Sequence, residues 1–407
     1  MAKAARIILI LMTAYVASII FPALYRSTFQ RNQPRMGMHY SEVINKFLFI
    51  GQEKDMILDS DGNRYTYQEY ERLVPLSAVN QLVKAGEFPD SIQGVPVTPE
   101  IAFSTMFEHY VYMSPNKRDY KLRVLTHGGT DRVGFIRTGD MMRVNKHGIQ
   151  FYNSAAGGVD TAKSELFDRE LKQLGYVPPA KELLGNSGGI KRDNGLFFID
   201  QNDRIFQVRY YAYQPIVNEI KLPDGVTPRK MEFPSANDEI VSYIIGSDNV
   251  VYILQPEGNL IPLKLDGFDY DTFTQFHLMG HLLYRLVVIS KPGYEKMFVY
   301  DRNYNLIDSQ EISYKTYEQT MTGVIESAIF PAITTTYNYR DGYDFKTHWS
   351  PVYCFIWLNL LLAVGLVIIK LVKRRNFKAF SNIADIVLVA AFGILAFVGV
   401  FIYPNRE

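Results

Sequence analysis

The sequence has few of the residues on which catalytic and redox sites depend. Its 407 residues include one cysteine, Cys354, which lies in an apolar stretch near the C-terminus. The rest of the chain therefore has no disulfide, no thiol nucleophile and no cysteine-based metal site. No glycine-rich loop followed by lysine is present, which excludes the common phosphate-binding loop of ATPases. The net charge of +1 at pH 7 argues against a nucleic-acid-binding protein, because such proteins carry basic surfaces.

The chain does contain three long apolar runs, at residues 7–24, 352–372 and 383–403. Each run is close to the ~20 residues that a helix needs to cross a bilayer. A short basic turn separates the last two runs, and cation-rich loops of this kind stay in the cytoplasm. Its cations are Lys373, Arg374, Arg375 and Lys378. The sequence therefore predicts a multi-pass protein of the bacterial inner membrane, with a cytoplasmic N-terminus, a periplasmic main domain and an outer C-terminus at Glu407.

The N-terminal run resembles a secretory signal peptide in its charge order, because Lys3 and Arg6 precede it. A cleavable signal needs small residues at its end, and this run continues through Phe21 past its small residues. We interpret it as an uncleaved anchor, with a cleaved signal as the alternative. The predicted domains are an N-terminal transmembrane anchor at 1–25, a neck at 26–45, an extracytoplasmic β-rich domain at 46–346 and a C-terminal transmembrane hairpin at 350–407.

The long middle part alternates apolar and polar residues in short strands that tight turns interrupt. Turns rich in Asp, Asn and Gly near residues 147, 200, 256 and 301 are spaced by 53, 56 and 45 residues. A four-stranded propeller blade needs roughly 40–50 residues. We predict a mainly β, propeller-like antiparallel meander, with a β-sandwich as the structural rival. Helical insertions are expected at 77–86, at 161–174 and, on a weaker pattern, at 98–112.

The most conspicuous candidate for catalysis is Ser187, in the sequence Gly-Asn-Ser-Gly-Gly. This spelling matches a nucleophile elbow, which requires a strand before the serine and a helix after it. Here a helix-end pattern precedes Ser187 and a polar loop follows it. We interpret the segment as a glycine-rich connection and keep an envelope hydrolase as an alternative.

His277 and His281 lie four residues apart, the spacing of paired zinc ligands on a helix. Metalloproteases carry a glutamate beside the first histidine, and Leu278 occupies that position. The sequence that follows indicates a strand. We interpret both residues as structural histidines, with a metal site as the alternative, and predict no catalytic, cofactor-binding or metal-binding residues and no cofactor.

Polar and small residues inside the last two apolar runs are the candidate membrane-interaction sites. Asn359 lies within the second run and Asp385 within the third, and such residues are expensive in lipid. Asp385 is close enough to the basic turn to reach the interface instead. Small residues let helices approach closely, which favours a further membrane subunit as partner. The small residues of the third run are Ala390, Gly393, Ala396 and Gly399.

The order of anchor, β-rich domain and terminal hairpin resembles a Bacteroidetes family of unknown function, the DUF4857 domain proteins. The resemblance also rests on the stretch 185–200, where a Gly-Asn turn leads into the aromatic strand Leu-Phe-Phe-Ile and the Asp that follows it. It implies no catalytic residues, and it implies an ABC-type export system, with its permease and ATPase, as the partner.

These observations together predict a non-enzymatic membrane protein that acts as an accessory or sensing subunit of a membrane complex. The membrane-anchored hydrolase, using Ser187 or a metal at His277 and His281, is one alternative. A periplasmic module that binds glycans or peptides is another, favoured if aromatic side chains line one rim of the domain. Nucleic acid is not an expected partner.

Overall fold

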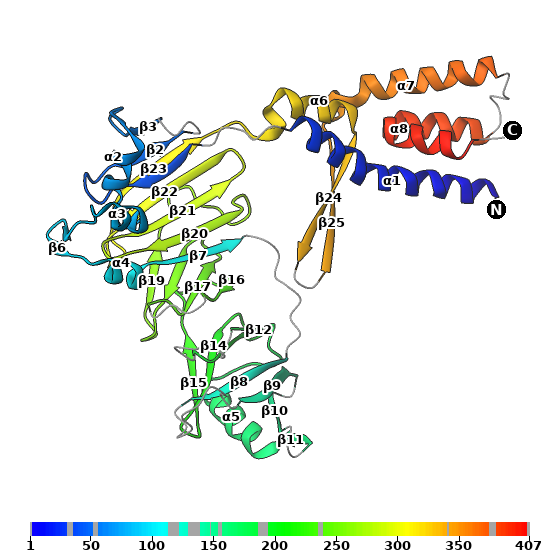
Figure 1. Cartoon of the computed structure of the whole chain (residues 1–407). Coiled ribbons are helices and arrows are strands. Elements are labelled where there is room, and N and C mark those ends of the chain that lie inside the picture. The colour runs from blue at the N-terminus through cyan, green and yellow to red at the C-terminus, as the bar shows by residue number, and fades with distance from the viewer. Residues whose placement is uncertain are drawn as a thin grey trace. The chain divides into compact units, whose positions relative to one another are not determined.

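The computed structural model describes residues 2–30, 36–51, 56–112, 122–128, 139–146, 148–153, 157–185, 194–234, 239–339, 342–373 and 380–404. It divides into two compact units (Figure 1). The membrane unit comprises Met1–Arg35 and Tyr314–Glu407, and the β domain comprises Met36–Ser313. In this division residues 36–45 fall in the β domain and residues 314–346 in the membrane unit, whereas the sequence-based prediction placed the β-rich domain at 46–346.

The membrane unit contains the three apolar runs as helices. α1, α7 and α8 have mean hydropathies of 2.4, 2.6 and 2.6 and are long and apolar enough to cross a membrane, which confirms the three predicted stretches. A short amphipathic helix and a two-stranded hairpin complete the unit. The elements are α1 (Ala2–Phe29), the 3₁₀ turn η1 (Tyr317–Gln319), α6 (Met321–Ile329), β24 (Ala332–Tyr339), β25 (Gly342–Trp349), α7 (Val352–Val372) and α8 (Phe380–Ile402).

α8 is not one straight helix, because its backbone leaves the helical region at Gly393 (φ 56°, ψ −132°). The guanidinium of Arg6 donates to the carboxylate of Asp385 and also to the carbonyl of Tyr403. A straight helix would separate Asp385 from Tyr403 by about 27 Å, far beyond the reach of one guanidinium. α8 therefore consists of two half-helices that reverse at Gly393, and it looks shorter than α7 although it has more residues (Figure 1).

This reversal corrects the expected path of the third run. Tyr403 lies beside Arg6 and Asp385, at the end of the unit where α8 begins. The last residues that the structure describes are therefore on the same side as the basic turn between α7 and α8. The expected exit of the C-terminus on the opposite side assumed a straight crossing, and one glycine prevents it.

The β domain consists of open antiparallel sheets with one parallel contact, between β8 and β14. The first sheet orders β1 (Gly37–Tyr40), β2 (Phe47–Ile50), β3 (Ile57–Asp59) and β4 (Arg64–Tyr65). The next contains β8 (Leu122–Gly128), β9 (Gly139–Asn145), β10 (Gly148–Asn153), β11 (Gly158–Asp160), β12 (Glu182–Leu184), β13 (Leu196–Ile199), β14 (Ile205–Tyr211) and β15 (Gln214–Ile220). Another orders β16 (Pro228–Glu232), β17 (Ser242–Gly246), β18 (Val251–Leu254) and β19 (Leu260–Leu263).

A five-stranded sheet contains β7 (Phe107–Tyr112), β20 (Gln275–Gly280), β21 (Arg285–Lys291), β22 (Tyr294–Tyr300) and β23 (Leu306–Ser313), and β5 (Ser91–Ile92) pairs with β6 (Val95–Pro96). Strands β12–β15, β16–β19 and β20–β23 form consecutive four-stranded meanders (Figure 1). Their facing side chains form shared apolar cores between the first and second meanders and between the second and third. The predicted meander is therefore confirmed, but the sheets are open and a closed propeller is not present in the described part of the chain.

Three turns share one arrangement of aspartate, among them the predicted turns near residues 200 and 301. Asp59, Asp200 and Asp301 each accept, through Oδ1, the backbone N–H groups two and four residues later, at 2.8–3.0 Å. An Asx turn of this kind closes a tight reversal without a further partner. The spacing of the predicted turns corresponds to real hairpins. It does not determine whether the sheets close into a propeller.

The helical insertions are α2 (Tyr67–Leu73), α3 (Val79–Ala85), α4 (Pro99–Thr105) and α5 (Thr161–Gln173). The expected helices at 77–86 and 161–174 are present. α4 begins after a Thr98 cap with Pro99 at its first position, but it ends at Thr105, and the alternating residues that follow form β7. The expected helix at 98–112 is therefore wrong in its second half.

Candidate functional site in the membrane unit

The membrane unit holds an ion cluster at the end where α1 begins and α7 ends. Asp385 is 0% exposed, and its two carboxylate oxygens accept from the guanidinium of Arg6 at 2.8 and 3.0 Å. Lys370, also buried, donates to the same carboxylate at 2.8 Å and to Asn382 Oδ1 at 2.6 Å. Asp385 therefore joins three helices from within the unit.

The position of each member follows from the helix arrangement. α7 and the first half of α8 run in opposite directions, so Lys370 in the last turn of α7 meets Asp385 near the start of α8. Arg6 lies near the start of α1, which packs against α8. The cluster contains two cations and one carboxylate. Such a buried arrangement is weak evidence for stability, because desolvation opposes the attraction, but removal of one partner is costly.

The second polar site is the break in α8. Asn359, 1% exposed, donates through Nδ2 to the carbonyls of Ala390 and Ala391 at 3.2 and 3.3 Å. These carbonyls end the first half-helix, where the reversal at Gly393 removes their intrahelical donors. Backbone groups in a membrane need partners from within the protein. Asn359 therefore caps a broken helix, which explains why a polar residue lies in the middle of α7.

Gly393 is required for two reasons. Its φ of 56° with ψ of −132° lies in a region that side chains other than hydrogen avoid. A Cβ at this position would also lie 2.0 Å from Asn359 Oδ1. The break and its cap are thus a matched pair of residues on different helices.

The other small residues of α8 pack inside the chain. A Cβ at Gly399 would lie 3.1 Å from atoms of Ile10, so this glycine lets the second half-helix approach α1 closely. Ala396 is fully buried in the same core and Ala390 lies beside it. These residues, which we expected to face a further subunit, are thus in contact with this chain's own helices.

The remaining predicted residues give less information. Lys373 is exposed and ends α7. Arg374, Arg375, Lys378 and the serine motif at Ser187 lie outside the described residues.

The two histidines of the metal alternative have separate partners in the β domain. The His277 ring stacks on Tyr110 at 3.8 Å, and its Nε2 lies 2.9 Å from Glu108 Oε1. His281 is buried, with Nε2 3.4 Å from Glu42 Oε1. The described residues contain no group of three or more His, Cys, Asp or Glu side chains that could hold a metal ion.

Glu42 was not foreseen from the sequence, because its turn between two strands reads as exposed. Burial raises the pKa of Glu42 to about 8, and burial together with the charge of Arg285 lowers the pKa of His281 to about 3. Both groups are therefore neutral near pH 7. Only the tertiary packing reveals this pair, since a lone glutamate after a serine carries no distinguishing pattern.

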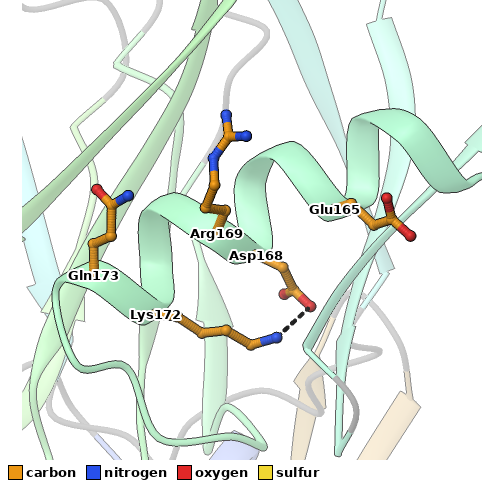
Figure 2. Close-up of a pocket in the computed structure, with 5 residues that line it drawn as sticks. All are labelled: Glu165, Asp168, Arg169, Lys172 and Gln173. Atoms are coloured by element: carbon orange, nitrogen blue, oxygen red, sulfur yellow. Dashed lines mark ion pairs between the residues drawn. The ribbon is translucent and has the colours of Figure 1, made fainter.

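A surface depression on the β domain is formed by α5 alone (Figure 2). Its side chains are charged or amide groups of the outer side of one helix, and Lys172 reaches back to Asp168 at 3.9 Å. Among the residues that the structure describes, no group from another element lines the depression. We therefore assign no site to it. The lining residues are Glu165, Asp168, Arg169, Lys172 and Gln173.

Comparison with known proteins identifies one family. A model described as "Domain of unknown function (DUF4857)" matches residues 37–300, which covers most of the β domain and none of the three apolar helices. Neither the curated proteins nor the solved structures include a match.

Proposed function

The chain belongs to the DUF4857 family, and we propose that it acts as an accessory or sensing subunit of a bacterial inner-membrane complex such as an ABC-type transporter. The observation that carries the proposal is the design of α8. A simple anchor needs one straight apolar helix, whereas this unit contains a helix broken at Gly393 and a buried ion cluster around Asp385. Buried charges and broken helices in membranes are expensive and accompany function.

The proposed topology places the N-terminus and the turn after Lys373 in the cytoplasm and the β domain in the periplasm. The basic turn supports this orientation through the excess of Lys and Arg that cytoplasmic loops carry. Because α8 returns to the side of the basic turn, the C-terminus is also proposed to be cytoplasmic.

The surface available to a partner lies on α7, since the small residues of α8 are covered by α1 and α7. Large apolar side chains form one stripe along the whole length of α7, each more than half exposed. Their spacing of three and four residues matches the seam by which helices pack in pairs. The stripe residues are Tyr353, Trp357, Leu361, Val364, Ile368 and Leu371.

The test is recovery of the tagged full-length protein from its native membrane in mild detergent, with mass spectrometry of what accompanies it. The proposal expects stoichiometric recovery of a permease and its ATPase, and loss of both with Val364→Trp on the stripe. Met12→Trp, on the exposed side of α1, is the matched control and is expected to retain them. Recovery of the intact protein alone would contradict the proposal.

A second candidate function, a periplasmic glycan- or peptide-binding module, is favoured by one feature of β7. This strand lies at the edge of its sheet and exposes Tyr110 (50%) and Tyr112 (57%), with roughly parallel rings. Glu108 accepts from the Tyr110 hydroxyl at 2.6 Å. Exposed tyrosines beside a carboxylate suit sugar rings and extended peptides. The test is co-sedimentation of the protein with isolated cell-wall glycan. Binding that the double change Tyr110→Ala and Tyr112→Ala abolishes would support this role. Equal sedimentation of the wild type and the double variant would exclude it.

A further inference from the structure

A polar cluster with buried and exposed members lies where three turns of the β domain meet. These turns connect β1 to β2, β5 to β6 and β20 to β21. Gln93, from the β5–β6 turn, donates through Nε2 to the carbonyl of Glu42 at 2.7 Å and to the hydroxyl of Tyr284 at 2.6 Å. The Tyr284 hydroxyl donates in turn to Asn45 Oδ1 at 2.8 Å. The cluster therefore fixes the first turn after β1 onto two other parts of the domain.

Glu42 and His281 face each other at the centre of this cluster and are 1% and 7% exposed. His281 Nδ1 accepts from the backbone N–H groups of Leu283 and Tyr284 at 3.3 and 3.4 Å. The proton of the neutral ring is thus on Nε2, which lies 3.4 Å from Glu42 Oε1. Glu42 Oε2 has no hydrogen-bond partner among the described residues.

The surroundings offer no charge that would compensate an ionised Glu42. From α2, Tyr70 lies near Glu42, and its hydroxyl is bonded to Nδ1 of His39 of β1 at 3.0 Å. From β21, Arg285 donates to Glu239 at 2.6 and 2.9 Å, and its charge opposes protonation of His281. Tyr284 is the remaining titratable neighbour and is bonded as described above.

We infer that Glu42 and His281 form a proton-binding switch that holds the β1–β2 turn closed while both side chains are neutral and releases it when either becomes charged. A charge on one of the two side chains alone faces a neutral partner, and burial of an unpaired charge is costly. Release affects the chain close to the membrane unit, because only seven residues separate the end of α1 from Gly37 at the start of β1. The signal would be the pH outside the cytoplasm, and the inference does not require a partner in the membrane.

The expected size of the effect follows from the two pKa values. In the open turn Glu42 and His281 regain values near 4.5 and 6.5, whereas the closed turn holds them at about 8 and about 3. Opening therefore increases as pH rises toward 8, because the open state loses the Glu42 proton first. The histidine contribution taken alone increases opening as pH falls from 6.5 toward 3, because the open state gains the His281 proton first, so the sum of the two contributions is lowest near pH 5.5. The opening constant is the ratio of open to closed turn. Between pH 5.5 and 8 the two contributions together raise it on the order of tenfold.

The variants Glu42→Gln and His281→Gln separate the contributions of the two side chains to the opening constant, because these contributions differ in sign and size. In Glu42→Gln only the histidine titrates, so the opening constant falls about tenfold between pH 5.5 and 8. In His281→Gln only the carboxyl titrates, and the constant rises on the order of a hundredfold over the same range. Glu87→Gln, at an exposed glutamate, is the matched control and should follow the wild type.

The experiment is hydrogen exchange of the full-length protein in detergent, measured by mass spectrometry at pH 5.5 and 8.0 and corrected for intrinsic exchange rates. Peptides from residues 37–50 report the turn, and peptides from β17 report the rest of the domain. The inference expects the opposite pH dependence of wild type and Glu42→Gln in the first set only. Identical pH dependence in these two proteins, or none in the wild type, would overturn it. If His281→Gln does not fold, infrared difference spectra supply the second test: a protonated carboxyl band that titrates near pH 8 and is absent from Glu42→Gln.

Discussion

The reversal of α8 makes a sharp prediction about Gly393→Ala. The backbone region at this residue costs a non-glycine residue about 1–3 kcal/mol. The new Cβ, 2.0 Å from Asn359 Oδ1, also displaces the amide from the two carbonyls that it caps. Hydrogen bonds between membrane helices contribute about 0.6 kcal/mol each. The substitution should therefore destabilise the membrane unit by about 3 kcal/mol.

Asn359→Ala separates the two parts of this cost. Alone it removes only the two capping bonds, or about 1 kcal/mol. In the double variant Gly393→Ala with Asn359→Ala the clash is absent and the backbone strain remains. We therefore expect a destabilisation of about 3 kcal/mol, and not the sum of the two single effects, about 4 kcal/mol. The difference of about 1 kcal/mol is the interaction energy of the pair. Gly365→Ala is the control, because a Cβ there meets no atom within 4 Å.

Tryptophan fluorescence can follow this unfolding selectively. The chain has two tryptophans, and the ring of Trp349 lies 5.9 Å from that of Phe392, next to the reversal. A Trp357→Phe background leaves Trp349 as the only reporter, and titration with denaturing detergent gives the free energy of unfolding. Equal stability of Gly393→Ala and Gly365→Ala would refute the account of the broken helix.

Three further outcomes are expected. Asp385→Asn leaves the buried Lys370 and the partly buried Arg6 without this counter-charge and should cost about 3–5 kcal/mol in the same titration, with partial recovery when Arg6→Gln is added; additive effects would contradict the cluster. A tag after Glu407 should be accessible from the same side of membrane vesicles as an N-terminal tag, and access from opposite sides would contradict the reversal. Burial opposes ionisation of Asp59, but hydrogen bonds from Asn63 and its neighbours lower its pKa to about 2. The β domain should then lose about 2 kcal/mol of stability as pH falls from about 4 to 2, measured by circular dichroism, and Asp59→Asn should not show this loss.

Local patterns in the sequence predicted much of the fold. Apolar length identified α1, α7 and α8, and the turns rich in Asp, Asn and Gly identified the hairpins at Asp200 and Asp301. These features depend on neighbours within a few residues, so a single sequence contains them. Closure of the sheets depends on contacts between distant strands, and equal turn spacing does not determine it.

The candidate site shows the same division. The polar residues Asn359 and Asp385 were recognisable as unusual, because lipid disfavours them wherever they face. Their partners were not recognisable, since Arg6 reads as a flanking charge of a signal-like segment and Lys370 as the end of a span. Gly393 read as one of several small residues, and only the backbone shows that it reverses the chain.

The reversal also changes where a partner should be sought. A straight third span with Gly393, Ala396 and Gly399 on one side would present a smooth surface to another subunit. Folded back, the same residues seal the contacts of α8 with α1 and α7, and the large side chains of α7 are left outside. A bulky substitution at Val364 tests the outer surface without touching the break, whereas Gly393→Ala tests the break without touching the outer surface. If both substitutions abolish partner recovery, the shape of α8 is itself part of the interface; if only Val364→Trp does, α8 serves to hold α7 in place.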